Sequence, residues 1–234
     1  MKTSLRSIRF QKGYMAHAEG SCLVTMGRTK VLCVATVEER VPPHAEQKGT
    51  GWIHAEYAML PRAGETRSPR GRVSGGGRSQ EISRLIGRSL RAAVHLEKLG
   101  PRTITVDCDV LRADGGTRTA SINGGCVALV QALSLLWKRK LLSDWPLRDF
   151  IAAVSVGLVK NKPVLDMAYV DDKEAQVDVN LVMTGKGHLV EIQGTAEGRP
   201  FTSLELNRMM KMAHRATNRI VSLQRKISPL PSLR

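Results

Sequence analysis

Apolar and polar residues alternate with a period of two in several parts of the chain, which is typical of strands with one buried face. Over residues 103–110, isoleucine, valine and cysteine alternate with threonine and aspartate. Residues 151–159 are apolar throughout, which favours a strand covered on both faces. The same patterns predict a hairpin over 21–37 and strands over 52–60, 164–170, 177–183 and 188–194.

The spacing of apolar residues changes to a helical period over residues 80–99. Ser79 is the expected N-cap, and Gly100 followed by Pro101 is the expected stop. Arg78 then lies just before the cap, at the start of the helix. A second helix is predicted over 120–137, where small and apolar residues indicate that it is buried.

A last helix begins at a capping box formed by Thr202 and Glu205. We expect a basic tail from about residue 222, with regular structure ending after Lys226 because prolines follow at 229 and 231. The expected core stripe of this helix is Leu206, Met209, Met210, Ala213, Ile220 and Val221.

Two segments carry the signals of loops. Residues 41–51 contain two prolines and two glycines, and residues 171–174 are expected to form a turn. Residues 61–77 interleave arginines with proline, glycine and serine, so little apolar surface can be buried there. We expect a mobile arm whose arginines contact phosphates: Arg62, Arg67, Arg70 and Arg72.

The chain has 234 residues and a net charge of +15. No linker or low-complexity tract interrupts it, so we favour one domain. Residues 61–91 have a net charge of +6 and residues 206–234 a net charge of +7, which together make 13 of the 15. Positive charge gathered in this way indicates a polyanionic partner, most commonly nucleic acid, although a solvated helix face would look the same.

The four cysteines lie in apolar surroundings without a CxxC pair, which predicts buried thiols in a reducing compartment. No histidine spacing typical of zinc sites occurs. We expect neither a signal peptide nor an apolar run of transmembrane length, and hence a cytoplasmic protein without a membrane partner.

A glycine turn follows the predicted strand over 103–110. Gly115 and Gly116 precede Thr117 and Arg118, and the second helix comes next. Backbone N–H groups at a helix N-terminus favour an anion, so this turn is a candidate phosphate site. The alternative is a turn whose arginine points into solvent. Arg78 at a second helix start favours the phosphate site.

Carboxylates near such a site could hold Mg²⁺, which takes oxygen ligands and often only one or two protein carboxylates. Asp172 lies in the predicted turn over 171–174 and Asp178 on the predicted strand that follows it, whereas Asp107 and Asp109 lie on the strand before the glycine turn. Spacing does not choose between the two pairs, and a solvated strand face would explain either.

The chain resembles the ribonuclease PH family of phosphate-dependent 3′ exoribonucleases, which is related to polynucleotide phosphorylase and the exosome ring. The likeness extends from about residue 17 to residue 201. Its motifs are HAEGS from His17, TKVLC from Thr29, AEYAMLPR from Ala55, GGR ending at Arg78, QEISRLIGRSLRA from Gln80, TITVDCDV from Thr103, ADGGTRTASI from Ala113 and EIQGTAEG from Glu191.

The resemblance implies an α/β protein with the RNase PH-type fold, similar to domain 2 of ribosomal protein S5, in which mixed β-sheets pack with α-helices. It implies a homohexameric ring built as a trimer of dimers. The implied activity is phosphorolysis of RNA 3′ ends, which trims tRNA precursors and releases nucleoside diphosphates, with reverse nucleotide addition as a further activity.

The resemblance also assigns residues. Phosphate binding falls on Arg78, Gly116, Thr117 and Arg118, and the essential acidic pair falls on Asp172 and Asp178. In this assignment Arg118 acts in catalysis, and Asp178 with Asp172 holds Mg²⁺ or, for Asp178, protonates the departing 3′ oxygen. RNA contacts fall on Arg62, Arg67 and Arg70.

The chain departs from the family pattern in three places. No RPDGR-like segment lies within residues 1–9, the arm between Arg70 and Arg78 is about two residues shorter, and the tail after about residue 222 matches nothing. A non-catalytic RNA-binding ring subunit of the same fold is the alternative, but such a subunit would be expected to lack some of the site residues. A basic nucleic-acid-binding protein of another kind would leave the two arginines at helix starts unexplained.

Overall fold

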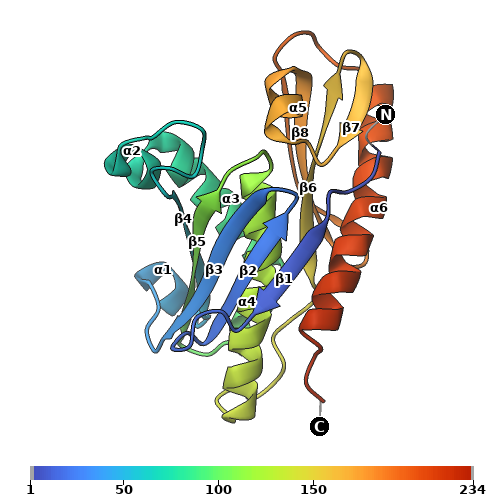
Figure 1. Cartoon of the computed structure of the whole chain (residues 1–234). Helices are drawn as coiled ribbons and strands as arrows, with labels where there is room; N and C mark the ends of the chain where they lie inside the picture. Colours follow the sequence, from blue (N-terminus) through green and yellow to red (C-terminus); the bar gives the residue numbers. More distant parts are fainter. Residues whose placement is uncertain (1–2, 233–234) are drawn as a thin grey trace.

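The computed structural model of the protein describes residues 3–232, with the side chains of 72–74 outside the description. Its strands form two sheets (Figure 1). The first has the order β1-β2-β3-β5-β4, and only β4 and β5 are parallel. Its strands are β1 (Ile8–Lys12), β2 (Gly20–Met26), β3 (Thr29–Glu38), β4 (Trp52–Met59) and β5 (Thr103–Arg112).

The second sheet has the order β7-β6-β8-β9 and is antiparallel throughout. Its strands are β6 (Ile151–Val159), β7 (Lys162–Leu165), β8 (Ala175–Thr184) and β9 (Leu189–Ala196). The helices are α1 (Pro43–Glu46), α2 (Arg70–Gly75), α3 (Gly77–Ala92), α4 (Thr117–Lys138), α5 (Tyr169–Lys173) and α6 (Ser203–Ile227), with a 3₁₀ turn at Leu96–Lys98.

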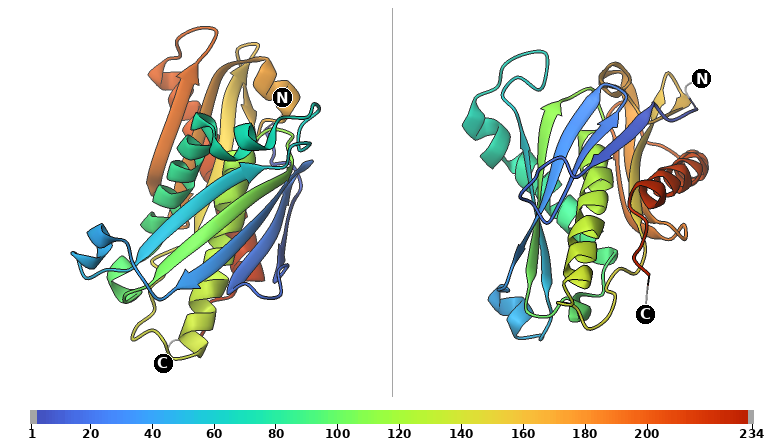
Figure 2. Two further views of the ribbon diagram at one scale, coloured as in Figure 1. Left: turned by 90° about the vertical axis from the view of Figure 1, so that its left-hand side faces the viewer. Right: turned by 60° about the horizontal axis from the view of Figure 1, so that its bottom comes forward.

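Helices and sheets alternate in layers. α4 packs on β2 and β3 of the first sheet and on β6 of the second, and α3 packs on β4 (Figure 2). α6 covers the other face of the second sheet, where it packs on β6. β6 is therefore covered on both faces, and this explains why its sequence is apolar without alternation.

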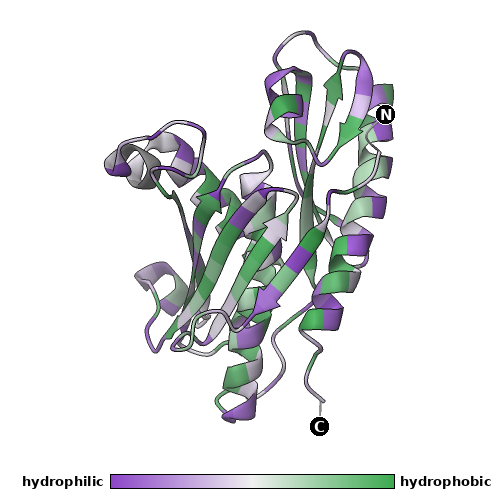
Figure 3. Ribbon diagram, in the orientation of Figure 1, coloured by the Kyte–Doolittle hydropathy of each residue, from purple (hydrophilic) through white to green (hydrophobic). Residues whose placement is uncertain are grey.

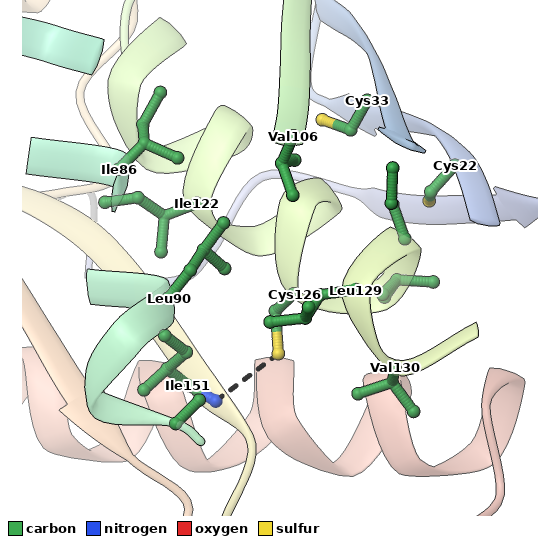
Figure 4. Close-up of a cluster of buried hydrophobic side chains, with 14 of the residues drawn as sticks. Cys22, Cys33, Ile86, Leu90, Val106, Ile122, Cys126, Leu129, Val130 and Ile151 are labelled. Atoms are coloured by element: carbon green, nitrogen blue, oxygen red, sulfur yellow. Dashed lines mark hydrogen bonds between the residues drawn. The ribbon is translucent and has the colours of Figure 1, made fainter. Parts of the chain in front are cut away.

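The core lies along α4. Fifteen of its 22 residues are buried, and a cluster around Cys22, Cys33 and Cys126 packs between the sheets (Figure 4). All four cysteines are free and buried, as predicted. Burial raises the pKa of the Cys22 and Cys126 thiols to about 12, so both stay protonated at neutral pH.

α4 corrects the expectation that no apolar run of transmembrane length occurs. By length and composition this helix is a candidate membrane span, but 83% of its most apolar window is buried inside the molecule. Contact with both sheets gives a physical reason for the composition, because a helix surrounded on all sides is apolar on all sides. Figure 3 shows the contrast with α6, where apolar and polar residues alternate along the ribbon.

The first predicted helix begins and ends earlier in the chain than expected. α3 begins at Gly77 and ends at Ala92, so Ser79 is a buried residue of its first turn and the N-cap is Gly76. The chain leaves the helix because Val94 pairs with Leu147 across an isolated bridge. The apolar residues after Ala92 are partly or fully buried around the 3₁₀ turn. Their apolar side chains made the helical spacing in the sequence continue beyond residue 92.

Three expected loops contain helices. Residues 41–51 include α1 with Pro43 in its first position, and the predicted arm over 61–77 includes α2. The strand expected over 164–170 ends at Leu165, because Asp166 adopts a left-handed φ of 52°. α5 follows in place of the expected turn, and the Asp171 side chain accepts a hydrogen bond from the Ala168 amide at 2.9 Å.

The last helix agrees with its predicted capping box, and both hydrogen bonds of the box are present. Regular structure was expected to end after Lys226, and α6 ends one residue later, at Ile227. The buried Gln224 amide donates to the carbonyls of Asn123 and Ile151 at 3.1 and 3.0 Å, which holds this last turn against the core. Residues 233–234 of the expected tail lie outside the described residues.

Candidate active site

A cavity of about 920 Å³ lies just beyond the end of β5, where Asp178 and Asn180 of β8 approach the first turn of α4. Six residues that the sequence singled out line it together: Arg78, Gly116, Thr117, Arg118, Asp172 and Asp178. They come from α3, α4, α5 and β8, which are far apart in the chain. The fold therefore collects cations, helix amides and carboxylates around one space.

The glycine turn starts α4 earlier than predicted. Gly116 is the N-cap and the helix begins at Thr117, so Thr117 and Arg118 belong to the first turn. Gly115 and Gly116 have φ of +72° and +66°, a region that favours glycine. The Thr29 hydroxyl donates to the Gly115 carbonyl at 2.7 Å and accepts from the Asp114 amide at 2.9 Å.

A buried ion pair ties this turn to the segment before α5. The Arg6 Nη2 atom lies 2.6 Å from Asp166 Oδ1, and the exposed fractions of the two side chains are 9% and 0%. Arg6 Nη1 also donates to the Asp114 carbonyl at 2.7 Å. A Cβ on Gly115 would lie 2.5 Å from the Met167 carbonyl oxygen. The glycine turn, which leads into the candidate phosphate-binding residues, is thus in direct contact with the segment that leads to Asp172.

Arg118 is held by two groups that sequence reasoning did not assign to it. Its Nη1 donates to Gln193 Oε1 at 3.1 Å and lies 3.5 Å from Glu81 Oε2. The Gln193 amide donates in turn to Glu81 at 3.1 Å and to Glu191 at 3.2 Å. Gln193 lies within the EIQGTAEG motif, which was the one available signal for it. These contacts connect α4 to α3 and β9.

Arg78 lies in the first turn of α3 rather than before its cap. Its side chain is exposed, and it makes no ion pair with any residue that the structure describes. Tyr57 connects the two arginines electrostatically: burial raises the pKa of its hydroxyl, whereas the hydrogen bond to Thr117 at 2.8 Å and the charges of Arg78 and Arg118 lower that pKa. The two cations therefore act on the same small region.

Asp178 has the most perturbed carboxyl of the site. Burial and the negative charge of Asp172 raise its pKa to about 6, while Arg118 and a hydrogen bond from Asn180 at 3.2 Å act in the opposite direction. Asp178 Oδ1 is buried without a hydrogen-bond partner among the described residues. An unpaired buried carboxylate oxygen beside a second carboxylate is costly, and a proton or a cation would remove that cost.

These two carboxylates fit a magnesium ion, which needs only one or two protein oxygens when phosphates supply others. Within the described residues, no group of three or more His, Cys, Asp and Glu side chains could hold a metal. The rival pair, Asp107 and Asp109, does not line the cavity. It lies on β5 beside Glu56 of β4, and burial raises the pKa of both carboxyls.

The predicted RNA-binding arginines Arg62, Arg67 and Arg70 are exposed and do not line the cavity. Their neighbours do, among them Pro61, Gly64 and Ser68. The Arg62 guanidinium donates to the Glu65 carbonyl, which curls the start of the arm on itself. The side chain of Arg72 lies outside the described residues. The arm therefore forms one rim of the cavity.

The fold and the cavity define an α/β protein whose site suits anionic substrates, with cations and helix N-termini on one side and a carboxylate pair on the other. The chain belongs to the 3′ exoribonuclease family: residues 4–133 match domain 1 of that family and residues 149–216 match domain 2. The resemblance to ribonuclease PH is thereby confirmed, and with it the expected fold class.

Solved structures show the same fold at low identity. Rice (Oryza sativa) Rrp46 has a TM-score of 0.79 at 18% identity, with 97% of each chain covered. A chain of the Archaeoglobus fulgidus exosome with RNA bound to the active site has a TM-score of 0.77 at 22% identity, covering 93% of this chain and 88% of that one. A chain of an archaeal exosome core has a TM-score of 0.74 at 20% identity, covering 96% and 87%.

Proposed function

We propose that the protein is a phosphorolytic 3′-to-5′ exoribonuclease that trims the 3′ tails of tRNA precursors and releases nucleoside diphosphates. The observation that carries this proposal is the single cavity that brings Arg78 and Arg118 to Asp172 and Asp178. Membership of the 3′ exoribonuclease family supports the reaction class. If these four groups lay apart, the net positive charge of the chain would be the only other support for an RNA substrate.

Inorganic phosphate would bind between the arginines at the two helix starts. Arg118 and Arg78 would donate charge-assisted hydrogen bonds, with amides of the first turn of α4 closing around the anion. Phosphate is already an anionic nucleophile at neutral pH, so the main barrier is its approach to another phosphate. Positive groups already fixed in place lower that barrier, because they need no reorganisation during the reaction.

In the reaction, a phosphate oxygen attacks the last phosphodiester phosphorus of the RNA. The bond from phosphorus to the 3′ oxygen of the preceding nucleotide breaks, and that oxygen keeps the electron pair and takes a proton. Asp178, whose pKa is raised to about 6, can hold that proton close to neutral pH. In the alternative role, Asp178 is ionised and would hold Mg²⁺ together with Asp172, and the ion would supply charge stabilisation at the phosphates. The reverse reaction would add nucleotides.

The partners follow from the same proposal. Arg62, Arg67 and Arg70 on the rim would contact RNA phosphates upstream of the reacting end. We propose a homohexameric ring of three dimers in the cytoplasm. The exosome chains among the structural neighbours support a ring assembly, and the net charge of +15 supports an RNA partner.

A non-catalytic RNA-binding ring subunit is the second candidate. The likeness to Rrp46 and to an archaeal exosome core chain favours it, because these structural neighbours are exosome ring subunits. The complete set of arginines and carboxylates in the cavity favours the enzyme.

The deciding experiment incubates the purified protein with Mg²⁺ and a 3′-extended tRNA, with and without inorganic phosphate, and identifies the released nucleotides. We expect nucleoside diphosphates only when phosphate is present. Nucleoside monophosphates without phosphate would indicate hydrolysis and contradict the proposal. RNA binding without any release would favour the ring subunit.

A further inference from the structure

A row of cations follows the outer face of α6 and has no part in the cavity. We define the basic stripe as Arg208, Lys211, Arg215, Arg219 and Lys226, all of which are exposed. At 100° per residue their side chains fall within about 80° of the helix circumference, and they span about 27 Å along its axis. The opposite face holds the buried residues Met209, Ala213 and Ile220.

The basic stripe is unpaired within the part of the chain that the structure describes. None of its five residues forms an ion pair or hydrogen bond with the residues that the structure describes. The single acid of α6, Glu205, pairs instead with Arg199 at 2.6 Å. Lys211 with Arg215 and Arg215 with Arg219 are like-charge pairs at i,i+4, which destabilise a helix. An ordinary solvated face would mix the two signs, so this arrangement serves something other than folding.

We propose that the basic stripe binds the phosphate backbone of the RNA substrate, upstream of the 3′ end that enters the cavity. This inference rests on the proposed function for the identity of the substrate. Glu197 lines the cavity, and α6 begins six residues later, at Ser203. The helix starts at the end of the molecule that carries α5 and runs toward the opposite end (Figure 1). The stripe thus leads away from the region of the site.

Two other partners agree less well with the surface. A second copy of this chain also carries a charge of +15, so contact through five unpaired cations would be repulsive. A membrane-bound helix would need large apolar residues beside the cations, and Leu204 at the start of α6 is the one strongly exposed apolar residue on the described helix. Binding of RNA phosphates requires no apolar residues beside the cations, and the phosphates carry the opposite charge that a second copy lacks.

The test replaces four residues of the stripe in one protein, R208Q/K211Q/R215Q/R219Q. The matched control replaces four exposed cations outside α6, K48Q/K138Q/R139Q/K140Q, which gives the same change in net charge. Both sets are made in an Asp178→Asn background so that RNA is not consumed. The probes are a short single-stranded RNA and a hairpin RNA that carries the same sequence as its 3′ tail.

We expect the stripe variant to bind the hairpin at least about tenfold more weakly than the control, with the salt slope of log K reduced by about 3 for four lost phosphate contacts. Binding of the short RNA should stay within about twofold. Equal losses in both variants, or equal losses for both RNAs, would overturn the inference. A lower mass of the stripe variant in light scattering would also overturn it and assign the stripe to contacts between subunits.

Failure of this inference can be told apart from failure of the proposed function. If the wild-type protein showed no phosphorolysis while the stripe variant still lost hairpin binding, the reaction would be wrong and the stripe would remain an RNA-binding surface. If phosphorolysis occurred and the stripe variant bound the hairpin normally, only the stripe would be wrong.

Discussion

At the scale of single residues, Arg118 is the cation on which the proposed reaction depends most. We expect Arg118→Ala to lower the phosphorolysis rate by about 10²–10³, because one fixed donor at the developing charge is lost. The protein should still fold, since this side chain is partly exposed and, among the described residues, its hydrogen bond and ion pair are with Gln193 and Glu81. Rates with saturating RNA at several phosphate concentrations would measure the loss.

Arg112→Ala is the matched control for that measurement. Arg112 is exposed at the end of β5 and does not line the cavity, so the same change in charge should leave the rate within about twofold. Equal losses in both variants would show that general charge, and not the position of Arg118, determines the rate.

Asp178 predicts a pH dependence of stability in the metal-free protein. Its pKa lies at about 6 in the folded chain against an ordinary value of 3.8, so the folded state binds more protons between about pH 4 and pH 6. The free energy of unfolding must therefore fall as pH rises through this window. The groups that face the carboxyl are Asp172, Arg118, Asn180 and Glu197, of which Asp172 and Glu197 raise its pKa.

Asp178→Asn removes the buried negative charge. We expect it to stabilise the protein by about 1–3 kcal/mol at pH 7.5 and to have little effect at pH 4.5, while it abolishes phosphorolysis. Urea unfolding at both pH values in the presence of a chelator would measure this. Asp144→Asn is the control, because the ion pair with Lys98 lowers the pKa of Asp144 and its removal should give no stabilisation. A destabilised Asp178→Asn at pH 7.5 would contradict the account.

At the scale of elements, the glycine turn joins the start of α4 to the segment before α5. Gly115→Ala would place a Cβ 2.5 Å from the Met167 carbonyl oxygen and would also strain a φ of +72°. We expect a loss of about 2–5 kcal/mol in the free energy of unfolding, together with a lower rate in the fraction that folds. The rate should fall because Arg118 would shift relative to Asp172.

The variant Gly13→Ala separates the effect of backbone strain from the effect of the close contact. Gly13 has a similar φ of +66° but nothing within 4 Å of an added Cβ, so this variant should lose only about 1–2 kcal/mol and keep its rate. Thermal unfolding and a phosphorolysis assay on both variants would distinguish strain from contact. The same loss in both would mean that the turn does not depend on its packing against residues 167–169.

At the scale of the whole molecule, one edge of the second sheet favours association between copies of the chain. β9 is an edge strand of the second sheet, and its Leu189 and Ile192 are 49% and 42% exposed. Exposed apolar residues on an open edge are a liability for an isolated chain. We expect light scattering to give a mass close to six times the 25.7 kDa of one chain, as the proposed ring requires. Leu189→Glu together with Ile192→Glu should lower that mass, whereas a monomeric wild type would contradict the ring.

The amino-acid sequence by itself determined the elements whose signals are local. Alternation predicted β5 and β8, an unbroken apolar run predicted β6, and the Thr202–Glu205 capping box predicted the start of α6. The motif around Gly116 located the candidate phosphate site. The predictions of β5, β6, β8 and the start of α6 succeeded because periodicity and caps depend on neighbours a few positions apart.

Only the tertiary structure decided which distant groups meet. It placed Asp172 and Asp178 in the cavity and left Asp107 and Asp109 outside it, a choice that spacing could not make. Gln193 and Arg6 received their contacts from partners 75 and 160 positions away in the chain. α3 ended earlier than predicted because the backbone of Val94 pairs with that of Leu147 in an isolated bridge instead of continuing the helix. Such contacts depend on how sheets and helices pack, and no local pattern encodes that packing.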